Sequence, residues 1–262
     1  DLGGVIRFED DGPIADVEIR AEAELRLDET LGDQTLPDTN DDDEAGIADP
    51  FGVGTLIGYD SITAAALLED GPAAYESQDG EKDRSYKLQV TGFAPAVLDD
   101  PDTLLVDESA DAIGVDSGLV DTSSDNKVFL FEEGDNLVGR VGTGADASDA
   151  AGAIVFVIGV DADTGEVEVA QYRAVKHDDA TDPDEAGTPE IMDSGVALLE
   201  VTVTDGDDDT DSDTVDLGGV IRFEDDGPIA DVEIRAEAEL RLDETLGDQT
   251  LPDTNDDDEA GI

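Results

Sequence analysis

The first 47 residues of the chain recur without a single change at its other end. Residues 1–47 and 216–262 are identical, at an offset of 215 residues. The chain therefore holds one full period of a tandem array and the start of the next period. Such arrays commonly provide length, spacing or multivalency. Because the period is far longer than the roughly 20–50 residues of solenoid repeats, each unit is predicted to be a whole domain.

Acidic residues dominate the composition. The sequence has 72 Asp and Glu against 13 Lys and Arg, which gives a net charge of −59. This charge excludes nucleic acid as a partner, because phosphate binding needs a basic surface, and it excludes anionic membrane surfaces for the same reason. Two exposed carboxylates about 4 Å apart repel each other by roughly 1 kcal/mol in water. Self-repulsion therefore opposes folding, and we expect divalent cations or high salt to neutralise it.

Cysteine is absent, and the chain has one histidine. Disulfides and thiolate-based zinc or iron–sulfur sites are therefore excluded. The longest apolar run, Ala153–Val160, has the length of a strand. No run approaches the roughly 18 apolar residues of a membrane span, so no membrane insertion is expected.

Alternation of apolar and charged residues predicts a β protein. The clearest candidate strand is Val17–Leu27, where every second residue is apolar and one face would be buried. Further strands are predicted at residues 86–90, 128–131, 137–141, 154–160, 166–176, 196–204 and 214–223. Residues 161–165 read as a hairpin turn, and only residues 61–69 look helical. We predict an all-β sandwich, immunoglobulin-like or related, with at most one short helix.

The joint between repeats is predicted at Phe223–Pro228 and at its copy, Phe8–Pro13. A strand ends at Phe223, and Gly-Pro then interrupts the chain before the next alternating run. Residues 14–228 are accordingly predicted to form one complete module. Residues 1–13 would be the last strand of the preceding repeat, and residues 229–262 the first strand and loop of the following one.

The acidic residues are bunched near predicted strand ends, where Gly and Thr neighbours leave backbone carbonyls accessible. Hard cations take six to eight oxygen ligands, and Ca²⁺ tolerates less regular geometry than Mg²⁺. We therefore predict several Ca²⁺ ions. The most specific cluster has acids at alternate positions after Thr204, as in a single loop that wraps around an ion. The candidate ligands are Asp205, Asp207, Asp209, Asp211, Asp213, Glu224, Asp225, Asp226, Glu9, Asp10, Asp11, Asp28, Glu29, Asp182, Asp184 and Glu185.

Catalytic patterns are poor, so the chain is not expected to be an enzyme or to have a small-molecule substrate. His177 precedes two aspartates, but no serine stands in a nucleophile-elbow context. We interpret His177 as a surface or calcium-loop residue. A carboxylate pair for glycoside hydrolysis would normally sit among aromatic platforms, and the chain has no tryptophan.

An ordered set of short motifs spans nearly the whole period. They are Leu27–Thr30, Ser85–Leu88, Asp116–Thr122, Gln171–His177, Asp182–Ala186, Val203–Asp207 and Phe223–Pro228. The set resembles the long repeat of giant repeats-in-toxin (RTX) adhesins of Gram-negative bacteria, which are exported by type I secretion. The resemblance implies a β-sandwich extender module with calcium in the modules or at their joints. It also implies an extracellular location at the bacterial surface, a role in cell adhesion and biofilms, and neighbouring identical repeats as partners.

The leading hypothesis is a structural extender, or spacer, that calcium folds and stiffens. Two alternatives stay open. The module could bind carbohydrate or another surface within the same adhesin, or it could belong to a halophilic surface protein whose acids hold hydrated salt without specific calcium sites. Sparse aromatic residues and identical tandem copies favour the spacer over the binding module.

Overall fold

The computed structural model describes residues 12–29, 47–69, 74–75, 80–93, 113–143, 148–178, 187–225 and 235. The chain divides into two compact units, residues 1–227 and 228–262. All the strands and the helix given below belong to the first unit. The predicted module boundary at residue 228 lies outside the described residues and stays a prediction.

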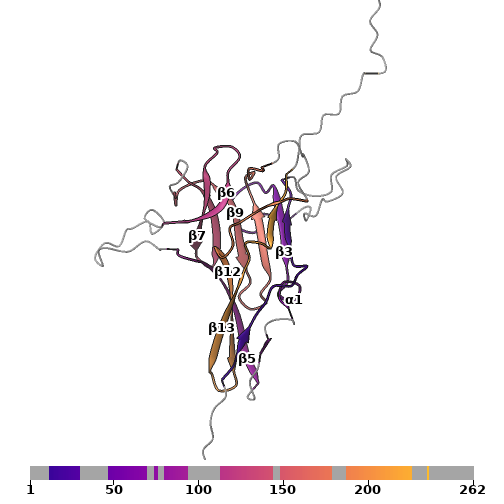
Figure 1. Cartoon of the computed structure of the whole chain (residues 1–262), viewed down its shortest axis with the longest axis vertical. Coiled ribbons are helices and arrows are strands. Elements are labelled where there is room, and N and C mark those ends of the chain that lie inside the picture. Colours follow the sequence, from indigo (N-terminus) through magenta and orange to yellow (C-terminus); the bar gives the residue numbers. More distant parts are fainter. Residues whose placement is uncertain are drawn as a thin grey trace, which may run out of the picture. The chain divides into compact units, whose positions relative to one another are not determined.

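Six strands form the largest sheet, which is antiparallel throughout and has the order β3-β10-β9-β8-β7-β6 (Figure 1). Its strands are β3 (Gly58–Ile62), β6 (Val115–Val120), β7 (Lys127–Glu133), β8 (Asn136–Val141), β9 (Ile154–Val160) and β10 (Val167–Gln171). Tight hairpins connect consecutive strands at its centre. Gly134 and Gly165 adopt the left-handed conformation in the β7–β8 and β9–β10 turns, at φ +67° and +70°, a region that glycine enters without steric cost.

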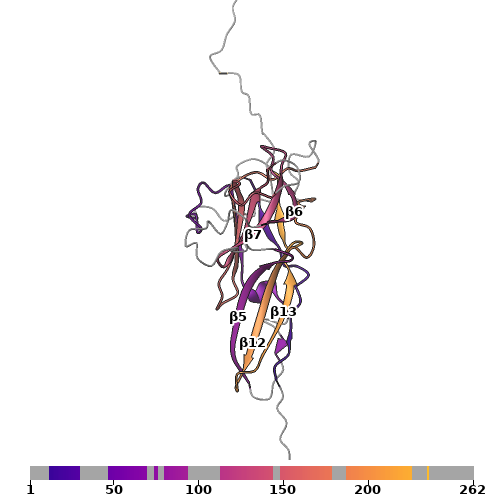
Figure 2. The same ribbon diagram turned by 90° about the vertical axis from the view of Figure 1, so that its left-hand side faces the viewer.

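A three-stranded antiparallel sheet, β13-β12-β5, faces the large sheet (Figures 1 and 2). Its strands are β5 (Glu81–Val90), β12 (Ala197–Asp205) and β13 (Thr210–Asp216). Along β12, buried residues alternate with half-buried ones. Leu199 and Val201 thereby enter the same hydrophobic core as Val155 and Ile158 of β9. Two sheets that share one core form a sandwich.

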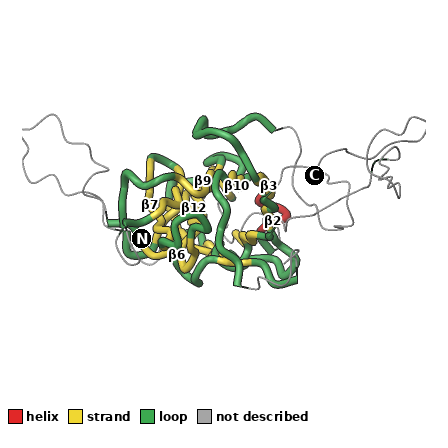
Figure 3. The backbone as a smooth tube through the Cα atoms, turned by 90° about the horizontal axis from the view of Figure 1, so that it is seen from above, coloured by secondary structure: helices red, strands yellow, loops and turns green. Residues whose placement is uncertain are grey.

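Short strands complete the unit. β11 (Glu190–Ile191), β14 (Ile221–Phe223) and β2 (Leu25–Leu27) form a small sheet in which β14 and β2 are parallel. A second small sheet pairs β1 (Ala15–Asp16) with β4 (Ala74–Tyr75). Among the described residues, α1 (Ala64–Leu67) is the one helix (Figure 3). The prediction of an all-β sandwich-like fold with at most one short helix is confirmed.

The predicted strands at residues 86–90, 128–131, 137–141, 154–160 and 196–204 are confirmed, as is the 161–165 turn. The strand predicted at 166–176 ends at Gln171, and the helix predicted at 61–69 is limited to Ala64–Leu67. The strand predicted at 214–223 is wrong as a single element, because β13 ends at Asp216 and β14 begins at Ile221. Asp216 Oδ1 accepts the Gly218 N–H at 2.9 Å, and this turn breaks the strand.

The prediction of one continuous strand at Val17–Leu27 is wrong. The Ala23 N–H donates to the Arg20 carbonyl at 3.0 Å, which closes a turn at Ala21–Glu22. Alanine and glutamate are weak strand formers, and the segment changes partners at this point. Val17 lies beside β13, whereas Leu25 pairs with β14.

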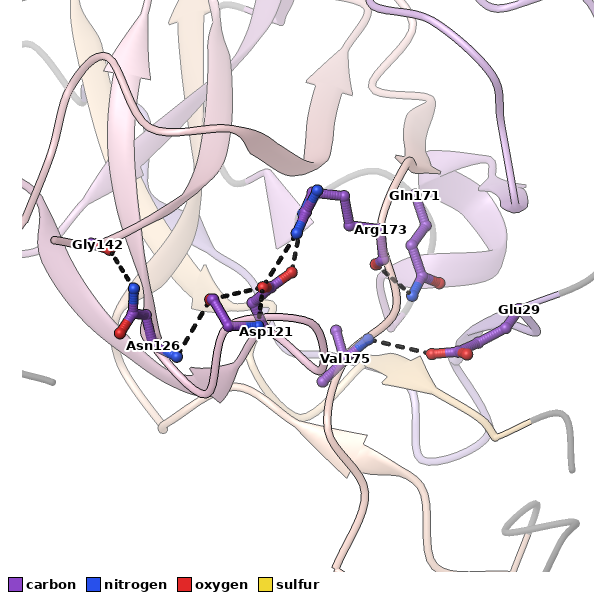
Figure 4. A network of polar contacts seen from close by, with 8 residues as sticks. Glu29, Asp121, Asn126, Gly142, Gln171, Arg173 and Val175 are labelled. Atoms are coloured by element: carbon purple, nitrogen blue, oxygen red, sulfur yellow. Dashed lines mark hydrogen bonds and ion pairs between the residues drawn. The ribbon is translucent and has the colours of Figure 1, made fainter. Parts of the chain in front are cut away.

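A buried ion pair fixes the loop that follows β6 (Figure 4). Asp121 is fully buried, and its carboxylate accepts two hydrogen bonds from the Arg173 guanidinium, at 2.8 and 3.1 Å. The backbone N–H and the hydroxyl of Ser124 donate to the same carboxylate, at 2.9 and 2.7 Å. Burial alone raises the pKa of Asp121, but these hydrogen bonds and the positive charge of Arg173 outweigh burial and hold the pKa below its usual value of 3.8.

We expect Asp121→Asn to lower the free energy of unfolding by about 3 kcal/mol at neutral pH, because it leaves a partly buried guanidinium without its counter-charge. Since the folded-state pKa of Asp121 is depressed, this stabilisation is complete above the unfolded pKa of about 3.9 and is lost as pH falls through the folded pKa. Urea unfolding of both proteins from pH 7 downward measures the difference, which should shrink in acid. A constant difference at every pH would contradict the assignment, and Asp163→Asn, at an exposed turn residue, is the control of equal charge.

Candidate metal centre and repeat joint

The β12–β13 turn is built by its own acidic residues. Asp205 ends β12 and is fully buried. Its Oδ1 accepts the Asp209 N–H at 2.9 Å, and its own N–H donates to the Asp209 carbonyl at 3.0 Å. Asp208 adopts a left-handed conformation at φ +83°, which aspartate tolerates better than most residues. The sequence Asp-Gly-Asp-Asp-Asp thus closes a tight turn whose carboxylates lie close together.

Three of these carboxylates form a candidate cation site. One oxygen each from Asp205, Asp207 and Asp209 lies within 4.8 Å of the other two. Carboxylates at this separation repel one another, and two basic residues of β5 form ion pairs in the turn region. Lys82 forms an ion pair with Asp208, and Arg84 forms one with Glu81 at 2.7 Å.

The donor set of this triad fits a hard cation. All three side chains offer carboxylate oxygens, the ligands that Ca²⁺ prefers. One Asp205 oxygen already accepts a backbone N–H, so the triad supplies only part of the six to eight oxygens that calcium takes. Backbone carbonyls of the turn or water would have to supply the rest.

Asp211 and Asp213 make backbone contacts that their spacing did not suggest, and metal binding by them stays a prediction. Both lie in β13, so the expectation of one loop running from Asp205 to Asp213 is wrong. Their carboxylates accept the backbone N–H groups of Ala15 and Val17, at 2.9 and 3.1 Å. Residues at alternate positions of a strand point to the same side, which lets the two carboxylates hold the neighbouring segment in register.

The incoming chain lies beside the acidic turn. A Cβ atom added to Gly12 would stand 3.7 Å from Oδ2 of Asp209. The predicted ligands Glu9, Asp10 and Asp11 directly precede Gly12 in the sequence but lie outside the described residues. Asp182, Asp184, Glu185 and Asp226 also lie outside them. Metal binding by these seven residues stays a prediction.

A second group of acids gathers where β2 and β14 end. The Glu224 N–H donates to the Leu27 carbonyl at 2.8 Å, which places Glu224 and Asp225 next to Asp28 and Glu29. Asp28 and Glu224 are both buried, at 4% exposure. Arg26 forms an ion pair with Glu224 and another with Glu24 at 3.4 Å.

His177 lies beside this second group. Its side chain is only 6% exposed, and its Nε2 is 3.9 Å from Oε1 of Glu29. Of the two predicted roles of His177, the little-exposed side chain does not fit a surface residue, and the role of a calcium-loop residue stays a prediction. The same Glu29 oxygen accepts the Val175 N–H at 3.1 Å (Figure 4), so residues 175–177 and the end of β2 are held together.

Gln171 and Gly58 contribute to this region, and neither was predicted from the sequence. A Cβ atom at Gly58 would lie 2.7 Å from the Asp28 carbonyl oxygen and 3.1 Å from Oε1 of Gln171. Gln171 is fully buried, and within the described part of the chain its Oε1 has no hydrogen-bond donor. The backbone at Gly58 thus lies too close to these two neutral oxygens to accommodate a side chain. The glycine and the glutamine carry no charge signal that would have revealed this in the sequence.

Comparison with known families adds an assignment. Residues 24–218 match the model of a family described as a domain of unknown function, DUF5801. The chain belongs to this family. The match begins just before β2 and ends just after β13, so the DUF5801 domain lies within the predicted module 14–228. No curated protein matches the chain, and no solved structure does.

Within the described part of this DUF5801 chain, no helix is both long enough and apolar enough to cross a membrane.

We expect the double variant Asp211→Ala, Asp213→Ala to lower the free energy of unfolding by about 2–4 kcal/mol, because two backbone N–H groups lose their carboxylate acceptors. The loss should be the same with a chelator as with calcium, since these acids act as hydrogen-bond acceptors. Chemical denaturation under both conditions measures it. The matched control is the double variant Asp135→Ala, Asp163→Ala, which removes two exposed turn acids. A loss seen only in calcium would instead assign Asp211 and Asp213 to an ion.

Proposed function

We propose that this DUF5801 chain is a spacer module of a tandem array in a bacterial cell-surface adhesin, folded and stiffened by calcium. The observation that carries the proposal is the exact repetition of residues 1–47 at 216–262, with the acid groups at the places where the chain enters and leaves the module. An array of identical domains suits length and multivalency. The resemblance to RTX adhesin repeats supports the same conclusion.

The repeat identity indicates what surrounds each joint. Gly227 is the copy of Gly12, and Gly12 lies beside the Asp205–Asp209 turn. Glu224, at the other end of the same short joint, lies beside Asp28. In an array, the acids of the joint would therefore be flanked by Asp28 and Glu29 of one module and by the acidic turn of the next. Cations bound there would link consecutive modules.

Calcium supplies positive charge where the chain has little of its own. Extracellular calcium-binding modules have dissociation constants of roughly 10⁻⁴–10⁻³ M, and ions that bind only the folded state stabilise it by mass action. The residues that would hold the ions are the Asp205, Asp207 and Asp209 triad at the turn, and Asp28, Glu29 and Glu224 at the far end of β2. Binding would replace mutual repulsion by attraction at both ends of the module.

The same charge suits type I export to the cell surface. In a cytosol with little calcium, −59 of net charge favours an open chain, and type I export passes unfolded chains. Outside the cell, millimolar calcium would favour folding. The absence of cysteine means that no disulfide forms before export.

We expect Ca²⁺ to raise the melting temperature, and the triple variant Asp205→Asn, Asp207→Asn, Asp209→Asn to lose part of that rise. At a calcium concentration ten times the dissociation constant, one site contributes about 1.4 kcal/mol. Calcium titration by calorimetry, with a thermal melt at each point, measures both effects.

The matched control for the triple variant is Asp161→Asn, Asp163→Asn, Asp135→Asn, which removes the same charge from two other hairpin turns. It should keep the full calcium response. If sodium chloride at equal ionic strength reproduced the whole shift, the acids would be holding hydrated salt and the specific sites would be disproved.

A further inference from the structure

The segment of residues 14–29 docks onto the rest of the module in an unusually regular way. Ala15 and Val17 are bound by Asp211 and Asp213, and each of these hydrogen bonds joins residues 196 apart. In the parallel pair of β2 and β14, Leu25 lies opposite Ile221 and Leu27 opposite Phe223, again a separation of 196 residues. The two ends of the segment 15–27 therefore meet residues 211–213 and 221–223 at the same sequence separation.

This docking is extensive and specific. Leu25 and Leu27 are fully buried. The Leu25 N–H donates to the Val220 carbonyl at 2.9 Å, and the Leu27 carbonyl accepts from Glu224 at 2.8 Å. On the other side, the Arg20 N–H donates to the Leu67 carbonyl at the end of α1, at 2.9 Å. The partners of the segment thus come from β13, β14 and α1, none of which is its neighbour in sequence.

An identical competitor for this docking surface exists in the same chain. Residues 229–244 repeat residues 14–29 without change, so Leu240 and Leu242 are copies of Leu25 and Leu27. Since the side chains and backbone groups are the same, every contact that residues 14–29 make can also be made by residues 229–244. Replacing one by the other loses no contact, which is the condition for low-cost exchange of an identical element between molecules.

We propose that residues 229–244 of one copy of this chain take the place of residues 14–29 in another copy. The proposed exchange is between molecules, and its dependence on protein concentration distinguishes it from exchange within one chain.

The exchange would connect neighbouring arrays through strands rather than through loops. Each module offers one acceptor surface, on β13 and β14, and each following repeat offers one donor segment. The inference depends only on the repeat identity and the docking contacts, so it does not depend on calcium or on the spacer function.

Three variants of the full 262-residue chain test the exchange. The first carries Leu25→Asp and Leu27→Asp, which disable the chain's own segment. The second carries the same substitutions in the copy, Leu240→Asp and Leu242→Asp. The third carries all four. Thermal melting and light scattering are measured over a wide range of protein concentration.

We expect the first variant to keep a cooperative melt as a dimer or larger assembly, with a melting temperature that rises with concentration. The second should melt like the unmodified chain, and the third should lose the cooperative transition. If the first variant unfolds like the third, residues 229–244 do not replace residues 14–29 and the proposal is overturned. A first variant that folds as a monomer, with a melting temperature independent of concentration, would also overturn it, because the exchange would then occur within one chain.

Discussion

Carboxylates in this domain act as hydrogen-bond acceptors for the backbone, and the joining of its sheets depends on this. With 72 acidic and 13 basic residues, most acids cannot have an ion-pair partner. Several instead accept an N–H group that no strand ladder satisfies. Glu132 of β7 accepts the Val90 N–H of β5 at 2.7 Å, which ties the two sheets together, and Asp216 accepts the Gly195 N–H at 2.7 Å.

Hydrogen bonds to a charged acceptor stabilise by about 1.5–3 kcal/mol each, which outweighs the roughly 1 kcal/mol of repulsion between neighbouring exposed carboxylates. Acids that look alike in the composition therefore act differently: a carboxylate that accepts a backbone N–H, as Asp205 does, stabilises the fold, whereas neighbouring carboxylates also repel one another.

The sequence predicted the fold well where burial alone decides the structure. β9 and β12 are the clearest cases, because a run of β-branched residues and a strict alternation both require burial on a sheet. The prediction failed where hydrogen bonds from side chains decide. Val17–Leu27 has a regular apolar alternation, yet it is two short pieces separated by a turn, since Asp211 and Asp213 bind the first piece and β14 pairs with the second. Those partners lie 196 residues away, and no local pattern carries information about them.

In the candidate site, too, the sequence predicted some features correctly and others wrongly. The bunching of acids after Thr204 marked the turn in which Asp205, Asp207 and Asp209 come together, because a strand that ends in Asp-Gly must turn there. The same alternation continued into β13 and led to the wrong expectation of a single loop. Alternate acids have the same spacing in a loop that surrounds an ion and along one side of a strand, so spacing does not separate the two structures. Gln171 and Gly58 were missed for another reason: their contribution is an amide oxygen and an absent Cβ, and neither produces a pattern in composition or charge.

The identity of the repeats and the acidic charge both affect how readily neighbouring repeats misassemble during folding. Identical neighbouring domains present identical strands to one another while they fold, which favours misassembly between repeats. In this module the segment of residues 14–29 carries this risk, because its partners lie 196 residues further along the chain. A high net charge keeps unfolded copies apart and slows wrong pairing as long as it is unscreened. A cation bound at the proposed site in the Asp205–Asp209 turn would stabilise the folded module and would also screen the repulsion between identical copies. An array with this sequence therefore needs each module to fold before identical copies come into contact.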